Sequence, residues 1–192
     1  TISSEGRRMS KLINDLLVLA NSDNASWSMN FKLEDIDTIV LNVYEAYIPL
    51  TKDKNIKLSI NLPENSLIKF NCDKERIYQL LSILMDNAIS YTNSNGKIVL
   101  SLDQNKKYVI LKVIDTGIGI SNEDKEHIFE RFYRADNSRT DKNHFGLGLS
   151  IAYEIIKLHK GIINVYDTVG GGSTFVIRIP IGIYDSQFTM HN

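Results

Sequence analysis

The spacing of apolar and polar positions divides the chain into an N-terminal helical segment and a longer mixed unit. Between residues 2 and about 21, apolar side chains recur at steps of three and four residues, which predicts one face of an amphipathic helix. The turn formers Ser22-Asp-Asn-Ala-Ser-Trp-Ser interrupt this pattern, so a linker is expected over residues 23–30. A separate domain is expected over residues 31–180, followed by a tail, 181–192, with little structure of its own.

Strand and helix patterns alternate within residues 31–180. Residues 56–62 alternate as a half-buried strand does, Asp73 is placed to cap the helix that follows it, and Pro49 is expected to kink or end its helix. The predicted strands lie near residue 31 and at 56–62, 67–71, 97–102, 108–114, 162–167 and 174–180, and the predicted helices at about 35–51, 74–91, 122–129 and 146–159. This order predicts an α/β (α+β) two-layer sandwich, with helices on one face of a mixed sheet, preceded by one amphipathic helix.

The amino-acid composition narrows the classes of protein to which this chain could belong. The 22 basic and 23 acidic residues nearly cancel, so there is no electrostatic case for a nucleic-acid partner. Cys72 is the single cysteine, which excludes a disulfide or a cysteine metal site within one chain and favours a reducing cytosol. No apolar stretch is long enough to cross a bilayer and no signal peptide opens the chain, so this chain is not expected to be inserted in a membrane. Because it begins at Thr1, within the predicted helix, we expect a piece of a longer protein.

The most informative segment is Asp115-Thr-Gly117-Ile-Gly119, at the end of the apolar run 108–114. A strand here delivers an acid into a turn with two glycines, so the backbone can approach the edge of a flat ligand. The carboxylate can then accept a hydrogen bond from an amino group on that edge. Taken alone, the segment also fits an ordinary turn after a strand.

Two further segments carry polar groups suited to a phosphate ligand. Asn87 lies at the edge of the apolar stripe of the helix 74–91, where its carboxamide oxygen can join the shell of a Mg²⁺ ion already held by phosphate oxygens. In 128–134, Ile-Phe-Glu-Arg-Phe-Tyr-Arg, aromatic residues can anchor a loop while Arg131 and Arg134 reach phosphate oxygens. In isolation, each is better explained by polar side chains on an exposed face.

Two glycine-rich segments complete the set. Gly146-Leu147-Gly148-Leu149-Ser150 opens a helix, and glycines there leave amides bare at the positive end of the helix dipole, which is an anion site. The segment 170–175, Gly-Gly-Gly-Ser-Thr-Phe, fits a hairpin turn and also permits close backbone packing beside a ligand.

In this order and spacing, the segments resemble the N, first glycine, F, second glycine and third glycine boxes of sensor histidine kinases. These kinases belong to the GHKL superfamily, which has the Bergerat ATP-binding fold, and the likeness covers roughly residues 31–180. Residues 1–22 resemble the second helix of the dimerisation and phosphotransfer hairpin of the same kinases. The resemblance implies an ATP-dependent protein-histidine kinase that binds ATP with Mg²⁺.

The resemblance also implies a role for each matching residue. Asn87 would coordinate Mg²⁺, and Asp115 would accept from the adenine amino group, so guanine would be rejected. Gly117 and Gly119 would line the base, and Tyr91 would flank the nucleotide.

At the phosphate end, the resemblance implies that Arg134 approaches the γ-phosphate and that residues 131–145, including Arg131, form the ATP lid. The amides of Gly146, Leu147, Gly148 and Leu149 would cradle phosphates. Gly172 to Thr174 would close the far side of the pocket.

Three departures from the pattern of these kinases involve four positions. Ile83 stands where a second asparagine is usual, Ser90 stands where many carry a phosphate-facing lysine, and His144-Phe145 replaces a glycine and a threonine or serine. The first two remove polar contacts, so weaker affinity or turnover is expected. Members of the superfamily that hydrolyse ATP carry a glutamate at the position of Ile83, and because isoleucine cannot act as a general base, transfer is favoured over hydrolysis.

No histidine of the chain has the context of a phosphoacceptor. His127 is expected to be solvated on a short helix, His159 to interact with the C-terminal end of its helix, His144 to lie in the lid and His191 in the tail. The acceptor is therefore expected upstream of Thr1.

The implied partners are a response regulator receiver domain and a second copy of the full-length protein, joined through the hairpin helix, with the domain on the cytoplasmic side of the membrane. Two alternatives remain: an anti-sigma-factor type serine kinase, which would lack the helix of residues 1–22, and a degenerate, non-catalytic nucleotide-binding scaffold, which Ile83 and Ser90 make conceivable.

Overall fold

The computed structural model describes residues 29–64, 68–134 and 146–181. The expected hairpin helix 1–22, the expected tail from residue 182 onward, His144-Phe145 and His191 lie outside these ranges, so the division into domains stays a prediction. Within the described ranges, no helix is long and apolar enough to cross a membrane.

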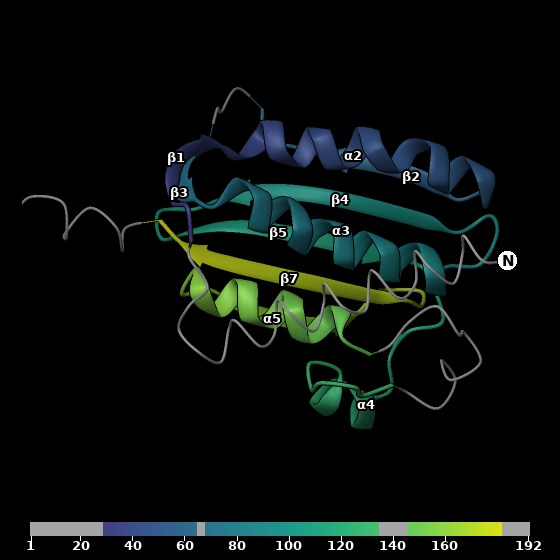
Figure 1. Cartoon of the computed structure of the whole chain (residues 1–192). Helices are drawn as coiled ribbons and strands as arrows, with labels where there is room; N and C mark the ends of the chain where they lie inside the picture. Colours follow the sequence, from purple (N-terminus) through teal and green to yellow (C-terminus); the bar gives the residue numbers. More distant parts are fainter. Residues whose placement is uncertain (1–28, 65–67, 135–145, 182–192) are drawn as a thin grey trace, which may run out of the picture.

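A five-stranded mixed sheet forms one layer, in the order β2-β4-β5-β7-β6 (Figure 1). Its strands are β2 (Lys57–Asn61), β4 (Lys97–Gln104), β5 (Tyr108–Asp115), β6 (Ile162–Asp167) and β7 (Ser173–Pro180). The pair β2 and β4 is parallel, and the other neighbouring pairs are antiparallel. A separate two-stranded antiparallel ribbon joins β1 (Lys32–Asp35) to β3 (Lys69–Cys72).

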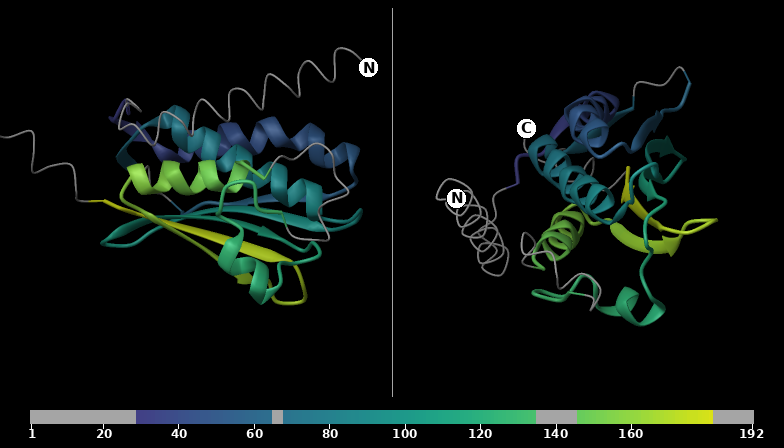
Figure 2. Two further views of the ribbon diagram at one scale, coloured as in Figure 1. Left: turned by 60° about the horizontal axis from the view of Figure 1, so that its bottom comes forward. Right: turned by 90° about the vertical axis from the view of Figure 1, so that its right-hand side faces the viewer.

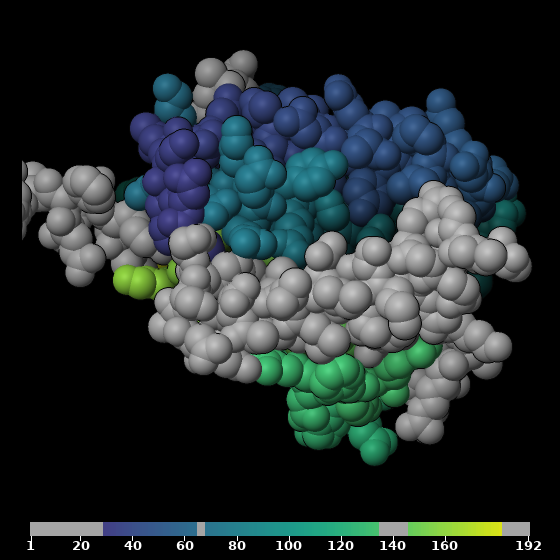
Figure 3. Space-filling view, viewed as in Figure 1, coloured from purple at the N-terminus to yellow at the C-terminus, as the bar shows by residue number. Residues whose placement is uncertain are grey.

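Three helices cover one face of the sheet: α2 (Ile36–Asp53), α3 (Lys74–Tyr91) and α5 (Gly148–Leu158) (Figure 2). The short helix α4 (Asn122–His127) lies apart from this layer, and the surface view shows it on the opposite side of the molecule from α2 (Figure 3). Asp35 and Asp73 cap α2 and α3, since each carboxylate accepts from two backbone amides of the first turn. The predicted two-layer sandwich is confirmed.

Several element boundaries differ from the predictions by a few residues, and the differences in α2 and α5 concern the helical layer. The helix that contains Pro49 runs on to Asp53, so the proline does not end it. The helix expected at 146–159 is shorter, because Gly146 has a φ of +74° and therefore cannot continue a right-handed helix, and because His159 caps its C-terminal end.

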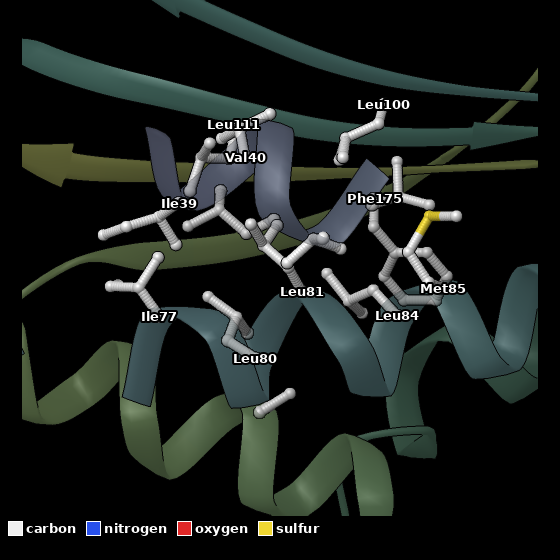
Figure 4. Close-up of a cluster of buried hydrophobic side chains, with 14 of the residues drawn as sticks. Ile39, Val40, Ile77, Leu80, Leu81, Leu84, Met85, Leu100, Leu111 and Phe175 are labelled. Carbon is white, nitrogen blue, oxygen red and sulfur yellow. The ribbon is translucent and has the colours of Figure 1, made fainter. Parts of the chain in front are cut away.

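The core lies between α3 and the sheet. Leu81, Leu84 and Met85 of α3 are fully buried and belong to one cluster of buried side chains with Leu100 and Leu111 of the sheet (Figure 4). This burial follows from the three- and four-residue spacing in α3 and from the alternation of buried and half-buried positions along β5.

Cys72, at the end of β3, is also fully buried. Burial raises the pKa of its thiol to about 12, so at neutral pH it is an unreactive thiol.

Candidate functional site

A cavity of about 840 Å³ lies between α3, the start of α5, the end of β5 and the turn between β6 and β7. Side chains from all of these elements line it, together with residues from α4 and from the segment after it. From the helices and the segment after α4 come Gln79, Ser82, Ile83, Asp86, Asn87, Ala88, Tyr91, Asp124, Ile128, Tyr133, Arg134 and Gly146 to Leu149; from the strand ends and turns come Asp115, Ile118 to Ser121, Asp167, Thr168, Gly171, Gly172, Ser173 and Phe175.

Asp115 occupies the last inward-facing position of β5. Buried and half-buried residues alternate along this strand, so Asp115 continues the row of Leu111 and Val113 beyond the apolar core and into the cavity. Its Oδ1 accepts from the backbone amides of Gly117 at 2.8 Å and Ser173 at 3.2 Å. Its Oδ2 accepts no hydrogen bond from a residue in the described ranges, which leaves this oxygen for a ligand donor.

Burial raises the pKa of Asp115, and the two amide hydrogen bonds act against that rise. The side chain is only 4% exposed. A buried acceptor that is fixed by two backbone donors recognises an amino group, because a ligand carbonyl in the same place would leave two acceptors facing each other.

The glycines around Asp115 allow three stretches of backbone to meet. A Cβ on Gly117 would collide with the carbonyl oxygen of Tyr91, at the end of α3, and one on Gly172 would collide with the carbonyl oxygen of Asp115. Gly172 also has a φ of +103°, which side chains rarely adopt. Close packing here brings the turn between β6 and β7 against the end of β5.

One row of α3 faces the cavity. Gln79, Ile83, Asn87 and Tyr91 are spaced four residues apart, and all four line the cavity. The side chain of the half-buried Asn87 makes no hydrogen bond with another residue in the described ranges, so its carboxamide oxygen is available to a ligand or a cation.

Ser90 does not line this cavity. It faces a smaller hollow of about 310 Å³ beside Lys54, at the C-terminal end of α2.

The start of α5 presents bare amides to the cavity. Its N-cap residue, Leu147, has no side chain that could accept from the first turn, and its carbonyl accepts from Ser150 Oγ at 2.8 Å and from the amide of Ile151 at 3.0 Å. The amides of Gly148 and Leu149 therefore lie at the positive end of the helix dipole with no capping side chain, as an anion site requires. A Cβ on Gly148 would lie 3.3 Å from Ile83 Cγ2, so the isoleucine fills the space beside this helix start.

The cavity brings together most of the residues expected from the sequence. Asn87, Tyr91, Asp115, Gly119, Arg134 and Gly172 line it, as do Gly146 to Leu149.

Gly117, Arg131 and Thr174 do not line the cavity. Gly117 packs behind Asp115, and Arg131 is exposed. The Thr174 hydroxyl lies 2.9 Å from that of Thr168. On a strand, Ser173 and Phe175 share one face and Thr174 belongs to the other, and it is Ser173, with Thr168, that lines this wall of the cavity.

Several lining residues were not expected from the sequence, Asp124 and Asp167 among them. Asp124 accepts a hydrogen bond at 2.7 Å from Tyr133, one of the aromatic residues expected to anchor the 128–134 loop, and Asp167 forms an ion pair with Lys125 at 2.7 Å. These pairs join residues 9 and 42 positions apart, and no local pattern indicates them.

The two described histidines have structural contacts. His127 Nδ1 lies 2.8 Å from Glu130 Oε1, and this hydrogen bond raises the histidine pKa. His159 is fully buried, its Nδ1 contacts the carbonyl oxygen of Ile155 at 2.8 Å, and its Nε2 accepts from the amide of Asp73 at 3.2 Å. The expected contact of His159 with its helix end is thus confirmed. However, burial lowers its pKa, so this contact is made by a neutral imidazole.

The chain matches known proteins over most of its length. The family model described as histidine kinase-, DNA gyrase B-, and HSP90-like ATPase matches residues 72–183. The sensor histidine kinase RppB of Synechocystis sp. is 36% identical over 182 residues, which are 94% of this chain and 40% of RppB.

Solved structures show the same likeness. The histidine kinase AdeS of Acinetobacter baumannii superposes with a TM-score of 0.77 at 30% identity, over 93% of this chain and 81% of that chain. Histidine kinase ThkA, in complex with the response regulator protein TrrA, matches with a TM-score of 0.74 at 27% identity, over 94% of this chain and 49% of that chain.

The family match covers the elements that build the cavity, from α3 to β7. The chain spans 40% of the length of RppB, so it corresponds to one part of that relative. It belongs to the histidine kinase-, DNA gyrase B- and HSP90-like ATPase family, and its described residues form an ATP-binding catalytic domain of the sensor histidine kinase type.

Proposed function

We propose that this domain binds Mg-ATP in the 840 Å³ cavity and presents the γ-phosphate for transfer to a histidine of the dimerisation hairpin. The observation that carries the proposal is the geometry of Asp115, a buried acceptor that lines the cavity at the end of a core strand, with one oxygen fixed and the other without a hydrogen-bond donor among the described residues. The adenine amino group donates to that second oxygen. Gly119 and Ile118 lie beside the base, and Tyr91 flanks the nucleotide.

The phosphates lie at the other end of the cavity, near the start of α5. The amides of Gly148 and Leu149 donate to phosphate oxygens, and the guanidinium of Arg134 approaches the γ-phosphate. These groups offset phosphate charge and fix the orientation of the nucleotide, and positioning of this kind supplies most of the catalysis in phosphoryl transfer.

The donor set fits a Mg²⁺ ion that is shared with the nucleotide. In the described ranges, no three His, Cys, Asp or Glu side chains gather as a protein-only metal centre would require. Asn87 offers one neutral oxygen on α3, one turn after Ile83, which packs against the start of α5, and such an oxygen suits an ion held mainly by phosphate oxygens. When bound, the ion neutralises charge on the phosphates.

The α3 residues that face the cavity fit transfer of the ATP γ-phosphate better than they fit hydrolysis of ATP. Ile83 stands one helical turn before Asn87, packs against Gly148, and has no group that could activate water. An apolar side chain therefore takes the position on α3 from which a general base could activate water.

The acceptor histidine and the regulator belong to other segments or chains. ThkA has been solved with the response regulator TrrA, which supports a receiver-domain partner for this chain. We place the dimer contact in the hairpin of the full-length protein, and the domain on the cytoplasmic side of the membrane.

The substitution Asp115→Asn tests the proposed base recognition. Because two amides donate to the Oδ1 position, the asparagine oxygen must take that place and its NH₂ group must face the ligand. Affinity for ATP should then fall by about 10- to 100-fold, while the preference for ATP over GTP, whose base has a carbonyl at this edge, should narrow or reverse.

Titration calorimetry with MgATP and MgGTP measures both effects. Equal ATP affinity in the variant and the parent chain would contradict the role of Asp115. If the parent chain itself binds no nucleotide, the scaffold interpretation is favoured. Transfer is tested separately by supplying the hairpin with its histidine in trans and following labelled phosphate, and a chain that binds ATP but labels no histidine would contradict the kinase function.

A further inference from the structure

Tyr133 links the short helix α4 to the segment that carries Arg134. Its hydroxyl donates to Asp124 Oδ1 at 2.7 Å, and both side chains line the cavity. Because Tyr133 immediately precedes Arg134, any contact that fixes the tyrosine also limits the positions open to the arginine.

Asp124 is itself held firmly. Ser121 Oγ donates to Asp124 Oδ2 at 2.6 Å, and the backbone amide of Asp124 donates back to Ser121 Oγ at 3.0 Å, a reciprocal arrangement at the start of α4. The hydrogen bonds from Ser121 and Tyr133 lower the pKa of Asp124, so it is a carboxylate at neutral pH and its bond to Tyr133 is charge-assisted.

The backbone around Tyr133 is closely constrained as well. The amide of Phe132 donates to the carbonyl oxygen of Gly146 at 3.0 Å, and a Cβ on Gly146 would lie 2.7 Å from the carbonyl oxygen of Tyr133. Phe132 has a φ of +64°, an uncommon conformation for a bulky residue that persists only where its surroundings fix it. The Tyr133 side chain adds an anchor outside this backbone junction.

These contacts connect the two ends of the cavity. Ser121 follows the glycine turn after Asp115 by two residues, whereas Gly146 precedes the bare amides of α5. The Ser121–Asp124–Tyr133 chain of hydrogen bonds therefore runs from the side of the nucleobase to the side of the phosphates.

We propose that Tyr133 and Asp124 are positioning residues that hold Arg134 toward the γ-phosphate, and that their hydrogen bond sets how strongly the domain prefers ATP over ADP. The inference rests on the proposed role of Arg134. Neither Tyr133 nor Asp124 contacts the γ-phosphate in this proposal: both act through the arginine that follows.

The test compares affinities for MgATP and MgADP in the 192-residue chain, measured by titration calorimetry. The variants are Tyr133→Phe, Arg134→Ala and the double variant, and Asp124→Asn weakens the same hydrogen bond from its other end. Tyr108→Phe is the matched control, because Tyr108 starts β5 at the end opposite Asp115. Thermal unfolding of each variant verifies that it is folded.

Arg134→Ala should remove most of the preference for ATP. Tyr133→Phe and Asp124→Asn should each lower the ratio of ATP to ADP affinity by about threefold to tenfold, the size of one typical hydrogen bond, because the lost bond acts on the nucleotide only through Arg134. ADP affinity should hardly change, and Tyr108→Phe should match the parent chain. In the Arg134→Ala background, Tyr133→Phe should have little further effect.

The outcomes distinguish the proposed role of Arg134 from the positioning role of Tyr133 and Asp124. An unchanged ratio in Arg134→Ala would remove the proposed role of that arginine and the inference with it. A lowered ratio in Arg134→Ala with an unchanged ratio in Tyr133→Phe and Asp124→Asn would overturn the inference alone. Fully additive effects of Tyr133→Phe and Arg134→Ala would also overturn it, because the tyrosine would then act independently of the arginine.

Discussion

Gly172 offers a direct test of how the turn between β6 and β7 supports the binding site. Replacing it with alanine adds a methyl group at a φ of +103° and drives this group into the carbonyl of Asp115. Gly170 provides the matched control, because it has a similar φ of +88°, has nothing within 4 Å of its added Cβ, and does not line the cavity. Both variants therefore carry the backbone strain of a positive φ, and only Gly172→Ala adds a collision.

The expected magnitudes follow from these two contributions. Backbone strain for alanine at a positive φ costs about 1–2 kcal/mol, and this alone should appear in Gly170→Ala. The collision in Gly172→Ala forces the turn away from β5, and overpacking of this kind adds about 1–3 kcal/mol. The total loss in the free energy of unfolding should be about 2–5 kcal/mol for Gly172→Ala.

Nucleotide binding should separate the two variants further. When the turn moves, Asp115 loses the amide of Ser173 that helps to fix its Oδ1. Affinity for MgATP should fall by at least about tenfold in Gly172→Ala and stay unchanged in Gly170→Ala. Denaturant unfolding and titration calorimetry measure the two effects. If both variants lose the same stability and bind ATP equally well, close approach of this turn does not support the site.

Two further predictions concern Tyr47 and His159, which do not line the cavity. Tyr47→Phe removes a phenol whose one hydroxyl hydrogen is shared between Ser82 O at 2.9 Å and Asp86 Oδ1 at 2.8 Å, so it should cost about 1–3 kcal/mol in denaturant unfolding; a loss below about 0.3 kcal/mol would show that water replaces this shared bond. Because burial lowers the pKa of His159 below its ordinary 6.5, the unfolded chain takes up a proton that the folded domain does not. The histidine's contribution to stability is therefore present above pH 6.5 and is lost as the pH falls below it, with a slope of at most about 1.4 kcal/mol per pH unit. His159→Gln should flatten this part of the pH profile between pH 7 and 5, and an unchanged profile would assign the slope to other groups.

The sandwich could be predicted from the sequence because its core follows short-range periodicity. The three- and four-residue spacing of α3 and the alternation of β5 each indicate their own buried face. The position of Asp115 in the cavity can be predicted for the same reason, since an acid and two glycines directly after a buried strand form a local signal.

The rest of the site depends on contacts between distant positions. The amide of Ser173 donates to Asp115 across 58 residues, and Lys125 reaches Asp167 across 42; neither partner has a local pattern that indicates the other. The misplaced Thr174 is a different case, because strand alternation already assigns Ser173 and Phe175 to one face and Thr174 to the other. The start predicted for α5 is too early because the positive φ of Gly146 keeps this residue out of the helix, and the sequence shows only a glycine there.

Cys72 has a practical consequence for measuring motion in this domain. Since the one native thiol is enclosed and protonated, a cysteine introduced at a fully exposed position such as Val169, near the tip of the β6–β7 hairpin, would react alone with a maleimide dye or a nitroxide. Spectroscopic probes can therefore be attached site by site without first removing the native residue, and distances across the opening of the cavity can be followed with and without nucleotide.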